Sequence, residues 1–217
     1  MPTTVIARPR LTNVNTCRRS THAVLARIEP AYTPDRAAAQ RHVDLVDALH
    51  RETAHHLRRV SELAGALAAA TGADPDTIET TRLVGLLHDI GKAAIDPALL
   101  DAPRRLTMAE RTIINRHAEL GARMLDGDDT LSHLREAVAR HHDRWEDGGC
   151  EIPLAARIVA VVDAWDAMTM PRPYAPPMDP FDARQELRRC AGTQFDPELV
   201  GIFLAVVAPG LALARSA

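Results

Sequence analysis

The sequence predicts an all-α fold, a single helical bundle, from its composition and its helix signals. Of the 217 residues 46% are hydrophobic, mainly Ala, Leu and Val, whereas aromatic residues make up only 3%. The long alternations of Val, Ile and Thr with Gly-rich turns that are typical of β-sheets are missing. A chain of this length can bury one core, and no internal repeat or second domain boundary interrupts it.

The N-terminal half divides into an arm and two helix-forming stretches. Residues 1–33 mix Pro, Thr, Asn and Arg without periodicity, so they are expected to form a loosely ordered arm before a domain at 34–217. A helix-forming run extends from about residue 34 to 70, where Thr71-Gly72 stops it. Asp74-Pro75 offers an N-cap and a first-turn proline, so the next helix is expected to end at Leu87.

The C-terminal half shows further helices. Thr107 and Glu110 have the spacing of a capping box, so a helix is expected to start there and to carry His117 in its middle. The apolar stretch Leu154–Met170 is expected to be a buried helix because of its length. The remaining expected elements are an amphipathic helix around Leu131, Leu134 and Val138 that ends near His141-His142, a Pro-rich connector at 171–180, and closing helices at 182–190 and 197–207.

Charge and cysteine content exclude several functions. The formal net charge is −3 and the pI is about 6.4, so no basic field indicates binding to nucleic acid or to a membrane surface, and a small-molecule substrate is favoured. No apolar run reaches the length of a membrane span and no signal peptide is visible, so a cytoplasmic location is expected. Cys17, Cys150 and Cys190 are widely spaced, which argues against disulfides and against a thiolate zinc site.

The chain contains ten histidines, several of them in pairs, together with acidic residues at matching helix positions. Glu52 and His56 lie four apart on one expected helix, so both side chains can point into the same cleft. Asp163 lies in an apolar helix, where a carboxylate without a partner would be costly. Eight residues form a candidate set of ligands for divalent ions: Glu52, His56, His88, Asp89, His117, His141, His142 and Asp163.

Simpler interpretations stay open for some of these residues. A single histidine such as His117 is more often a hydrogen-bonded or exposed side chain than a metal ligand. Glu52 and His56 would also suit a solvated helix face with contacts between residues four apart. The remaining histidines lack a comparable context and are expected at the surface; they are His22, His42, His50, His55 and His133.

The segment Leu86–Lys92, with the sequence LLHDIGK, resembles the core motif of the HD superfamily of metal-dependent phosphohydrolases. The order of the other motifs over residues 44–205 resembles the HD-GYP branch, the cyclic di-GMP phosphodiesterases of bacteria. Those motifs are His56–Val60, Leu106-Thr107 with Glu110-Arg111, His117 with Gly121, His141–Trp145, Ile152–Leu154 with Ala156–Ile158, Asp163 with Asp166–Thr169, Arg172–Tyr174 and Gln194–Pro197.

This resemblance implies a role for each candidate residue. It assigns His56, His88, Asp89 and Asp163 to a first metal position, His117, His141 and His142 to neighbouring ions, and Glu52 to members with three metals. Two or three iron or manganese ions are expected. Hydrolysis would proceed by attack of a metal-bound hydroxide on phosphorus, with Asp89 and Lys92 as catalytic residues. Lys92, Arg144 and Arg172 would bind the substrate, Lys92 by neutralising charge on the phosphate or the leaving group.

The loop that gives the branch its name differs here. After His141-His142 the chain reads Asp147–Glu151 with the letters DGGCE and continues directly to Ile152, without the Gly-Tyr-Pro turn. The leading hypothesis is therefore a cyclic dinucleotide phosphodiesterase, with cyclic di-GMP the first candidate. The alternatives are a hydrolase of nucleotides or other phosphate esters, and a non-catalytic metal-containing signalling or binding module. A homodimer or a regulatory protein partner is left open.

Overall fold

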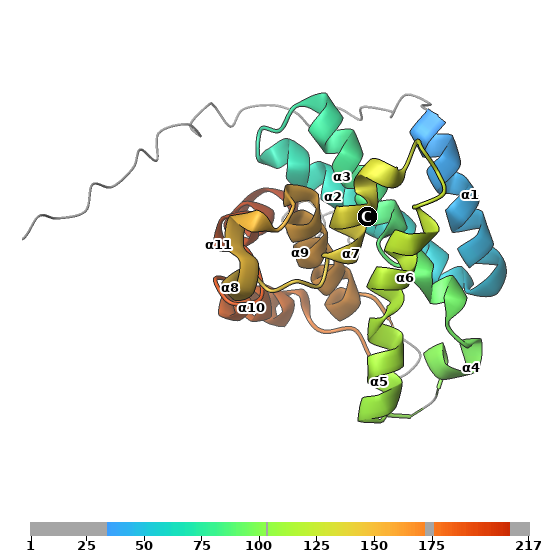
Figure 1. Cartoon of the computed structure of the whole chain (residues 1–217). Coiled ribbons are helices and arrows are strands. Elements are labelled where there is room, and N and C mark those ends of the chain that lie inside the picture. The colour runs from blue at the N-terminus through green and yellow to red at the C-terminus, as the bar shows by residue number, and fades with distance from the viewer. Residues whose placement is uncertain (1–33, 103, 172–175, 209–217) are drawn as a thin grey trace, which may run out of the picture.

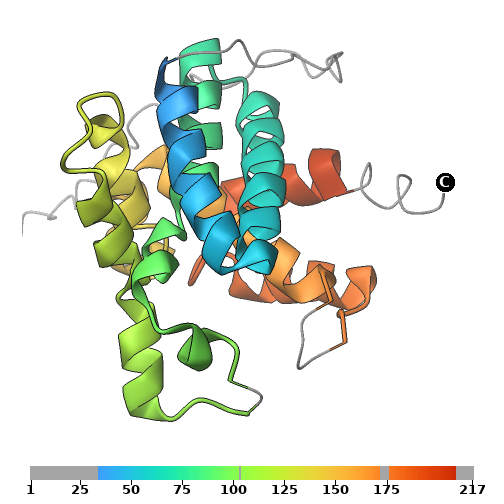
Figure 2. The same cartoon turned by 90° about the vertical axis from the view of Figure 1, so that its right-hand side faces the viewer.

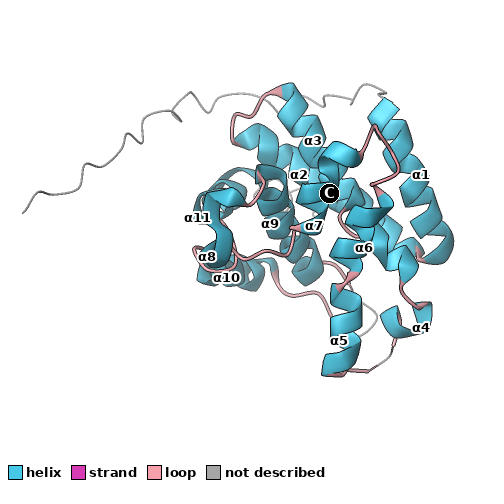
Figure 3. Ribbon diagram, in the orientation of Figure 1, coloured by secondary structure: helices cyan, strands magenta, loops and turns pink. Residues whose placement is uncertain are grey.

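The computed structural model describes residues 34–102, 104–171 and 176–208, and these contain helices and no named strand (Figure 3). The prediction of an all-α fold is confirmed. The arm expected at 1–33, which contains Cys17 and His22, lies outside the described residues, and so does Arg172. In chain order the elements are α1 (Pro34–Leu49), α2 (Arg51–Ala70), α3 (Pro75–Leu87), the 3-10 helix η1 (Ile90–Ala94), α4 (Pro97–Leu100), α5 (Met108–Asn115), α6 (His117–Met124), the 3-10 helix η2 (Ser132–Leu134), α7 (Arg135–Ala139), α8 (Trp145–Gly148), the 3-10 helix η3 (Gly149–Glu151), α9 (Leu154–Thr169), α10 (Pro180–Cys190), α11 (Pro197–Ile202) and the π-helical η4 (Phe203–Val207).

The helices surround a core between α2, α3 and α9. Figure 1 shows α1 and α6 on one side of these three helices and α8, α10 and α11 on the other. Figure 2, turned by 90°, shows α1 and α2 side by side. Leu57 of α2, Leu87 of α3 and Val162 of α9 are fully buried and belong to the same core. Burial of these apolar side chains holds α2, α3 and α9 against one another.

The run expected to form one helix from residue 34 to 70 is two helices. His50 separates them because its backbone is not helical, with φ −146° and ψ 83°. The break lets α1 fold back along α2, so that Val43 and Val46 are buried in the core. His50 is buried as well, so its expected place at the surface is wrong, whereas His55 and His133 are exposed as expected.

Helix α3 begins and ends as its sequence predicts. The carboxylate of Asp74 accepts a hydrogen bond from the backbone N–H of Thr77 at 2.9 Å, and Pro75 follows it in the first turn. The helix ends at Leu87, immediately before His88 and Asp89. Close contact with α2 is fixed by Ser61, whose hydroxyl donates to the carbonyl of Arg82 at 2.8 Å.

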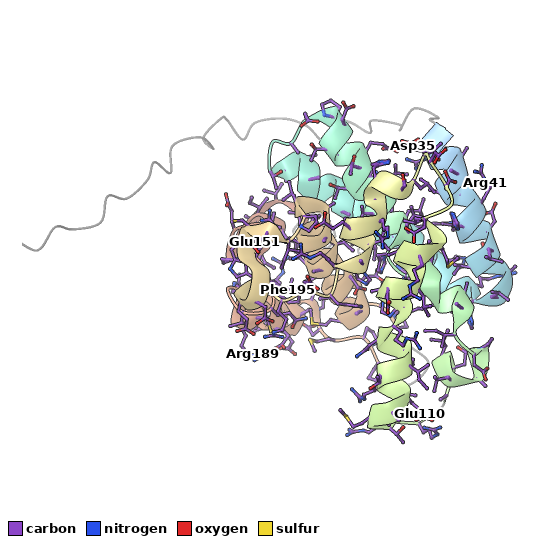
Figure 4. The ribbon with its side chains drawn as sticks, in the orientation of Figure 1. Asp35, Arg41, Glu110, Glu151, Arg189 and Phe195 are labelled. Atoms are coloured by element: carbon purple, nitrogen blue, oxygen red, sulfur yellow. The ribbon has the colours of Figure 1, made fainter. Side chains whose placement is uncertain are left out.

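The helix expected to carry His117 in its middle is divided in two at Arg116. Its start is confirmed, because Thr107 and Glu110 form the capping box. The N–H of Arg116 bonds to the carbonyl of Ile113, and the ring of His117 bonds to the carbonyl of Ile114, so the regular helix pattern stops. His117 is therefore the first residue of α6. Helix α5 projects away from the bundle, and Figure 4 places Glu110 toward its far end.

Helix α9 runs through the core as a buried helix, as expected, and the C-terminal helices pack on it. Trp165 meets Phe203 of η4 edge to face, with ring centroids 5.4 Å apart. Arg157 of α9 donates to the carboxylate of Asp196 at 2.6 Å, and Asp196 also caps α11. The closing helices are confirmed, although the last one changes from α11 to the π-helical η4 at Phe203.

Two expectations about cysteines and membranes can be compared with the described residues. Cys150 and Cys190 are free thiols there. Within the part of the chain that is described, no helix has the length and apolar character needed to cross a membrane.

Candidate metal centre

Seven of the eight candidate ligands come together from five parts of the chain. His56 lies on α2, and His88 and Asp89 follow the end of α3. His117 opens α6, His141 and His142 follow α7, and Asp163 lies on α9. The structure gathers these side chains into two groups that Asp89 connects.

The first group consists of His56, His88 and Asp163, whose nearest ligand atoms all lie within 4.8 Å of one another. Nε2 of His56 is 3.1 Å from Oδ1 of Asp163, and Nε2 of His88 is 4.0 Å from the same oxygen. His88 is fully buried, with an exposed fraction of 0%. Two imidazole nitrogens and a carboxylate oxygen at such separations are suitable ligands for one divalent ion.

The second group consists of His117, His141 and His142. Nε2 of His117 is 3.3 Å from Nε2 of His141 and 3.1 Å from Nε2 of His142. His117 and His141 are buried, whereas His142 is accessible from one side. The second group therefore combines buried ligands with one edge open to solvent.

Asp89 lies between the two groups and turns one oxygen toward each. Its Oδ2 is 3.5 Å from Nε2 of His88 and 3.7 Å from Nε2 of His56, while Oδ1 is 3.0 Å from Nε2 of His117. Burial raises the pKa of this carboxyl, but neighbouring positive charge, first of all the ammonium of Lys92 at 2.5 Å from Oδ2, holds the pKa well below its usual range. Asp89 is thus an anion placed to serve both groups.

Three of the imidazoles are oriented in the same way by their own chain. Nδ1 of His88 donates to the carbonyl of Gly85 at 2.8 Å, three residues earlier. His117 donates to Ile114 and His141 to Val138, both at 2.7 Å and with the same spacing. Each histidine lies just after a helix and bonds to a carbonyl in its last turn, where the regular intrahelical hydrogen bonds end. With the proton on Nδ1, Nε2 presents its lone pair to the centre.

The lone pairs provide a test of whether a cation fits. Nε2 of His88 is buried and has no hydrogen-bond partner among the described residues. Nε2 of His117 and Nε2 of His141 face each other at 3.3 Å, and neither carries a proton when Nδ1 is the donor. Buried acceptors in this arrangement are costly unless a positive group lies between them. The donor set therefore fits divalent metal ions.

The protonation of the imidazoles agrees with that test. Burial lowers the pKa of His88 and of His142, and it lowers the pKa of His141 well below its usual value. These three rings are neutral at pH 7, which is the form that binds a metal ion. His56 differs, because Asp163 and Asp166 outweigh the effect of burial and raise its pKa to about 9.

Gly91 and Gly121 hold η1 against α6 and so keep Asp89 beside His117. A Cβ added at Gly91 would lie 2.0 Å from the carbonyl oxygen of His117 and 2.4 Å from the backbone nitrogen of Gly121. At Gly121 the nearest atom to an added Cβ is the backbone nitrogen of Gly91, at 3.2 Å. The absence of a side chain at residue 91 is therefore what allows the two ligands to approach each other.

Comparison with known proteins identifies this arrangement. The profile of the HD domain family matches residues 40–199. The chain belongs to the HD domain family. The resemblance to the HD superfamily inferred from the LLHDIGK segment is thereby confirmed.

Named relatives of this HD domain are phosphodiesterases. A cyclic di-GMP phosphodiesterase of Thermotoga maritima is 35% identical over 162 residues, which cover 70% of this chain and 44% of the relative. The 3'3'-cGAMP-specific phosphodiesterase 2 of Vibrio cholerae is 32% identical over 168 residues, which cover 73% of this chain and 32% of the relative. The chain thus spans less than half the length of these curated relatives.

A solved structure shares the fold. The HD domain of the phosphodiesterase PgpH from L. monocytogenes, in complex with cyclic-di-AMP, matches with a TM-score of 0.60 at 19% sequence identity. The match covers 79% of this chain and 95% of that chain.

Two further predicted site residues of the HD domain, Glu52 and Arg144, lie outside the two ligand groups. Glu52 is exposed on α2, one turn before His56. Its negative charge contributes to the raised pKa of the Arg59 guanidinium. Nε of Arg144 lies 2.6 Å from Oε1 of Glu146. The positive charge of Arg144 also acts on the pKa of the Cys190 thiol, where it opposes the increase that burial causes. The roles of Glu52 as a ligand and of Arg144 in substrate binding stay predictions.

Sequence reasoning gave no role to Asp166, which contacts the candidate ligand His56, or to Arg59, which holds Asp166. Asp166 accepts a hydrogen bond from Nδ1 of His56 at 2.7 Å, and Arg59 donates two hydrogen bonds to Asp166. Asp166 appeared only as part of a family motif. Its position in the apolar stretch, three residues after Asp163, was the available signal, because a buried carboxylate needs a partner.

The open edge of the HD domain's second group borders a hollow. Its volume is about 510 Å³, and it lies where α5 and α6 meet the end of α7. The lining residues are Thr112, Asn115, Arg116, Ala118, Glu119, Ala139 and His142. Since His142 belongs to both the second group and this lining, the hollow extends to the edge of the second group.

Proposed function

We propose that this HD domain is a metal-dependent phosphodiesterase that hydrolyses a cyclic dinucleotide, with cyclic di-GMP the first candidate. The observation that carries the proposal is the position of Asp89. Its carboxylate presents one oxygen to the histidines of the first group and the other oxygen to His117 of the second group. A centre of this kind suits a phosphate group that must be bound by more than one cation. The names of the Thermotoga and Vibrio relatives support a cyclic dinucleotide as the substrate class.

The proposed centre holds two or three divalent ions, with iron or manganese as the metals. His56, His88, Asp89 and Asp163 would hold the first ion, and the second group would hold its neighbour. A donor set of imidazoles and carboxylates without thiolates is compatible with these metals. When bound, such ions supply Lewis-acid stabilisation of phosphate oxygens and lower the pKa of water.

Lys92 would bring positive charge to the substrate. Its ammonium lies 2.5 Å from Oδ2 of Asp89, and 25% of its side chain is exposed. The charged end of this partly exposed side chain is thus held beside Asp89, and in the proposal it would also neutralise charge on a phosphate or a leaving oxygen. The hollow beside His142 offers space for a part of the dinucleotide away from the reacting phosphate. Arg144 and Arg172 are the further substrate-binding residues that the proposal retains.

The test is hydrolysis by the purified protein after anaerobic loading with iron(II) or with manganese(II). Cyclic di-GMP, 3'3'-cGAMP and cyclic di-AMP would be incubated separately, and the products separated by chromatography. The linear dinucleotide or the mononucleotide is the expected product. Asp89→Ala should abolish both metal binding and turnover while the helical circular dichroism signal persists, whereas Asp44→Asn, an exposed change on α1, should alter neither.

One structural observation favours a second candidate, a hydrolase of nucleotides or other phosphate esters. The segment after His142 contains only the short elements α8 and η3 before α9, in place of the loop that carries the Gly-Tyr-Pro turn. Turnover of mononucleotides without turnover of any cyclic dinucleotide would establish that alternative. A metal-loaded protein that binds a cyclic dinucleotide and cleaves none of these compounds would instead indicate a non-catalytic binding module.

A further inference from the structure

His56 is oriented by a different kind of partner from the other buried imidazoles. His88, His117 and His141 each use a backbone carbonyl three residues earlier in the chain. Nδ1 of His56 instead lies 2.7 Å from Oδ2 of Asp166, which is 110 residues away on α9. The direction of this ring therefore depends on a contact between two helices.

Asp166 is itself fixed by Arg59, which lies one turn after His56 on α2. The Nε of Arg59 donates to Oδ1 at 2.8 Å, and Nη2 donates to Oδ2 at 2.8 Å. This two-point contact leaves the carboxylate little freedom to rotate. Oδ2 accepts from both Arg59 and His56, and Asp166 is only 3% exposed, so water is largely excluded from competing for it.

We propose that Asp166, held by Arg59, is a positioning residue that directs Nε2 of His56 toward the first metal position and strengthens it as a ligand. The inference rests on the proposed function, because it needs a metal ion at that position. A carboxylate that accepts the Nδ1 proton of an imidazole fixes its tautomer and orientation and makes Nε2 a better electron donor. In this structure Nε2 of His56 points toward Asp163, at 3.1 Å, and toward Asp89, at 3.7 Å.

A second ion pair on the same helix supplies a matched control. Arg58 donates to the carboxylate of Asp47 at 2.9 Å and joins α2 to α1, in the way that Arg59 joins α2 to α9. No hydrogen bond or ion pair connects Asp47 with a ligand residue among those described. If the pair of Arg59 and Asp166 only tied two helices together, its loss should resemble the loss of the pair of Arg58 and Asp47.

Arg59 can be changed with less disturbance than Asp166. Its side chain is 35% exposed and lines a hollow of about 370 Å³ together with Trp165, Thr169 and Met170. A shorter or neutral side chain at residue 59 leaves space that solvent can reach rather than a sealed cavity. Variants of Arg59 therefore test the proposal even where Asp166→Asn does not fold.

The experiment measures manganese(II) affinity by electron paramagnetic resonance of the free ion, with the full chain and without substrate. Asp166→Asn keeps the shape of the side chain but replaces one acceptor oxygen by an amide N–H that faces a donor of Arg59. The expected loss of manganese affinity is about 10- to 100-fold. Arg59→Met should give a smaller loss, Arg59→Lys a smaller one still, and Asp47→Asn none. The double variant Asp166→Asn with Arg59→Met should lose no more than Asp166→Asn alone, because Arg59 acts through Asp166.

Thermal unfolding of the metal-free proteins completes the test. Equal manganese affinity in the wild type and in folded Asp166→Asn or Arg59→Met, with a lower unfolding temperature as in Asp47→Asn, would overturn the proposal and leave a purely structural ion pair. Additive losses in the double variant would overturn the action of Arg59 through Asp166. A wild-type protein that binds no manganese or iron would overturn the proposed function as well, so the two failures are distinguishable.

Discussion

Replacing Gly91 by alanine should separate the two halves of the metal centre. The added Cβ would lie 2.0 Å from the carbonyl oxygen of His117 and 2.4 Å from the backbone nitrogen of Gly121. Both are backbone atoms of α6, so no side-chain rotation can relieve the contact. Real Cβ atoms essentially never approach closer than 3.0 Å, so η1 and α6 must move apart by about 1 Å.

The size of that movement sets the expected effect. Forcing one extra carbon into a packed contact typically costs about 1–3 kcal/mol of stability. Nε2 of His117 lies 3.0 Å from Oδ1 of Asp89, so a displacement of about 1 Å changes the distance between two ligands that must share one centre. A misplacement of about 1 Å can reduce a rate by about 100-fold. We therefore expect a folded Gly91→Ala protein with about 100-fold lower turnover in the proposed phosphodiesterase reaction.

The assay compares three alanine variants by urea unfolding, by metal content and by turnover. Gly121→Ala has a nearest contact of 3.2 Å and should lose less, while Gly127→Ala has no atom within 4 Å and should match the wild type. The expected order of activity is Gly127→Ala, then Gly121→Ala, then Gly91→Ala. Full metal content and wild-type turnover in Gly91→Ala would refute the argument that this contact sets the spacing of the ligands.

Three further predictions concern metal removal, pH and the C-terminal helices. Removing metal with a chelator should lower the unfolding temperature, because buried acceptors such as Nε2 of His88 then lack a partner; an unchanged temperature in a protein of verified metal content would contradict this. The raised pKa of His56, about 9 against 6.5, should stabilise the metal-free protein by about 3 kcal/mol below pH 6.5, and this should vanish as pH rises through 9. Urea unfolding of wild type and His56→Gln at pH 6 and pH 10 measures it, and a pH-independent difference would count against the shift. Asp196→Ala removes the cap of α11 and the partner of Arg157, so it should destabilise the protein by about 3 kcal/mol. Metal content should stay unchanged, and a loss of metal would contradict this prediction by showing that α11 supports the centre.

Most of the helices could be predicted because their ends carry local signals. Asp74-Pro75 and the capping box of Thr107 act within one turn of the chain, so the sequence alone is enough to place them. The breaks at His50 and Arg116 carry no glycine or proline. The break at Arg116 depends on the ring of His117 bonding to the carbonyl of Ile114, which a pattern of apolar residues does not reveal.

The candidate ligands could be predicted as a set but not as an arrangement. The order of the motifs pointed to seven residues that the structure brings together, yet sequence spacing gives no distance between α2 and α9. The link from His56 to Asp166 spans 110 residues and depends on how the bundle packs. Glu52 shows the opposite case, because a favourable spacing on α2 does not by itself bring a carboxylate into the ligand groups.

The two ways of orienting the imidazoles imply an order of assembly during folding. His88, His117 and His141 take their direction from carbonyls in the same turn, and such short-range contacts form early, before distant segments meet. His56 acquires its direction only after a loop of more than a hundred residues has closed and α9 has docked on α2. On this reasoning the first ligand group is completed after the second, and an ion bound there would report that α9 has docked on α2.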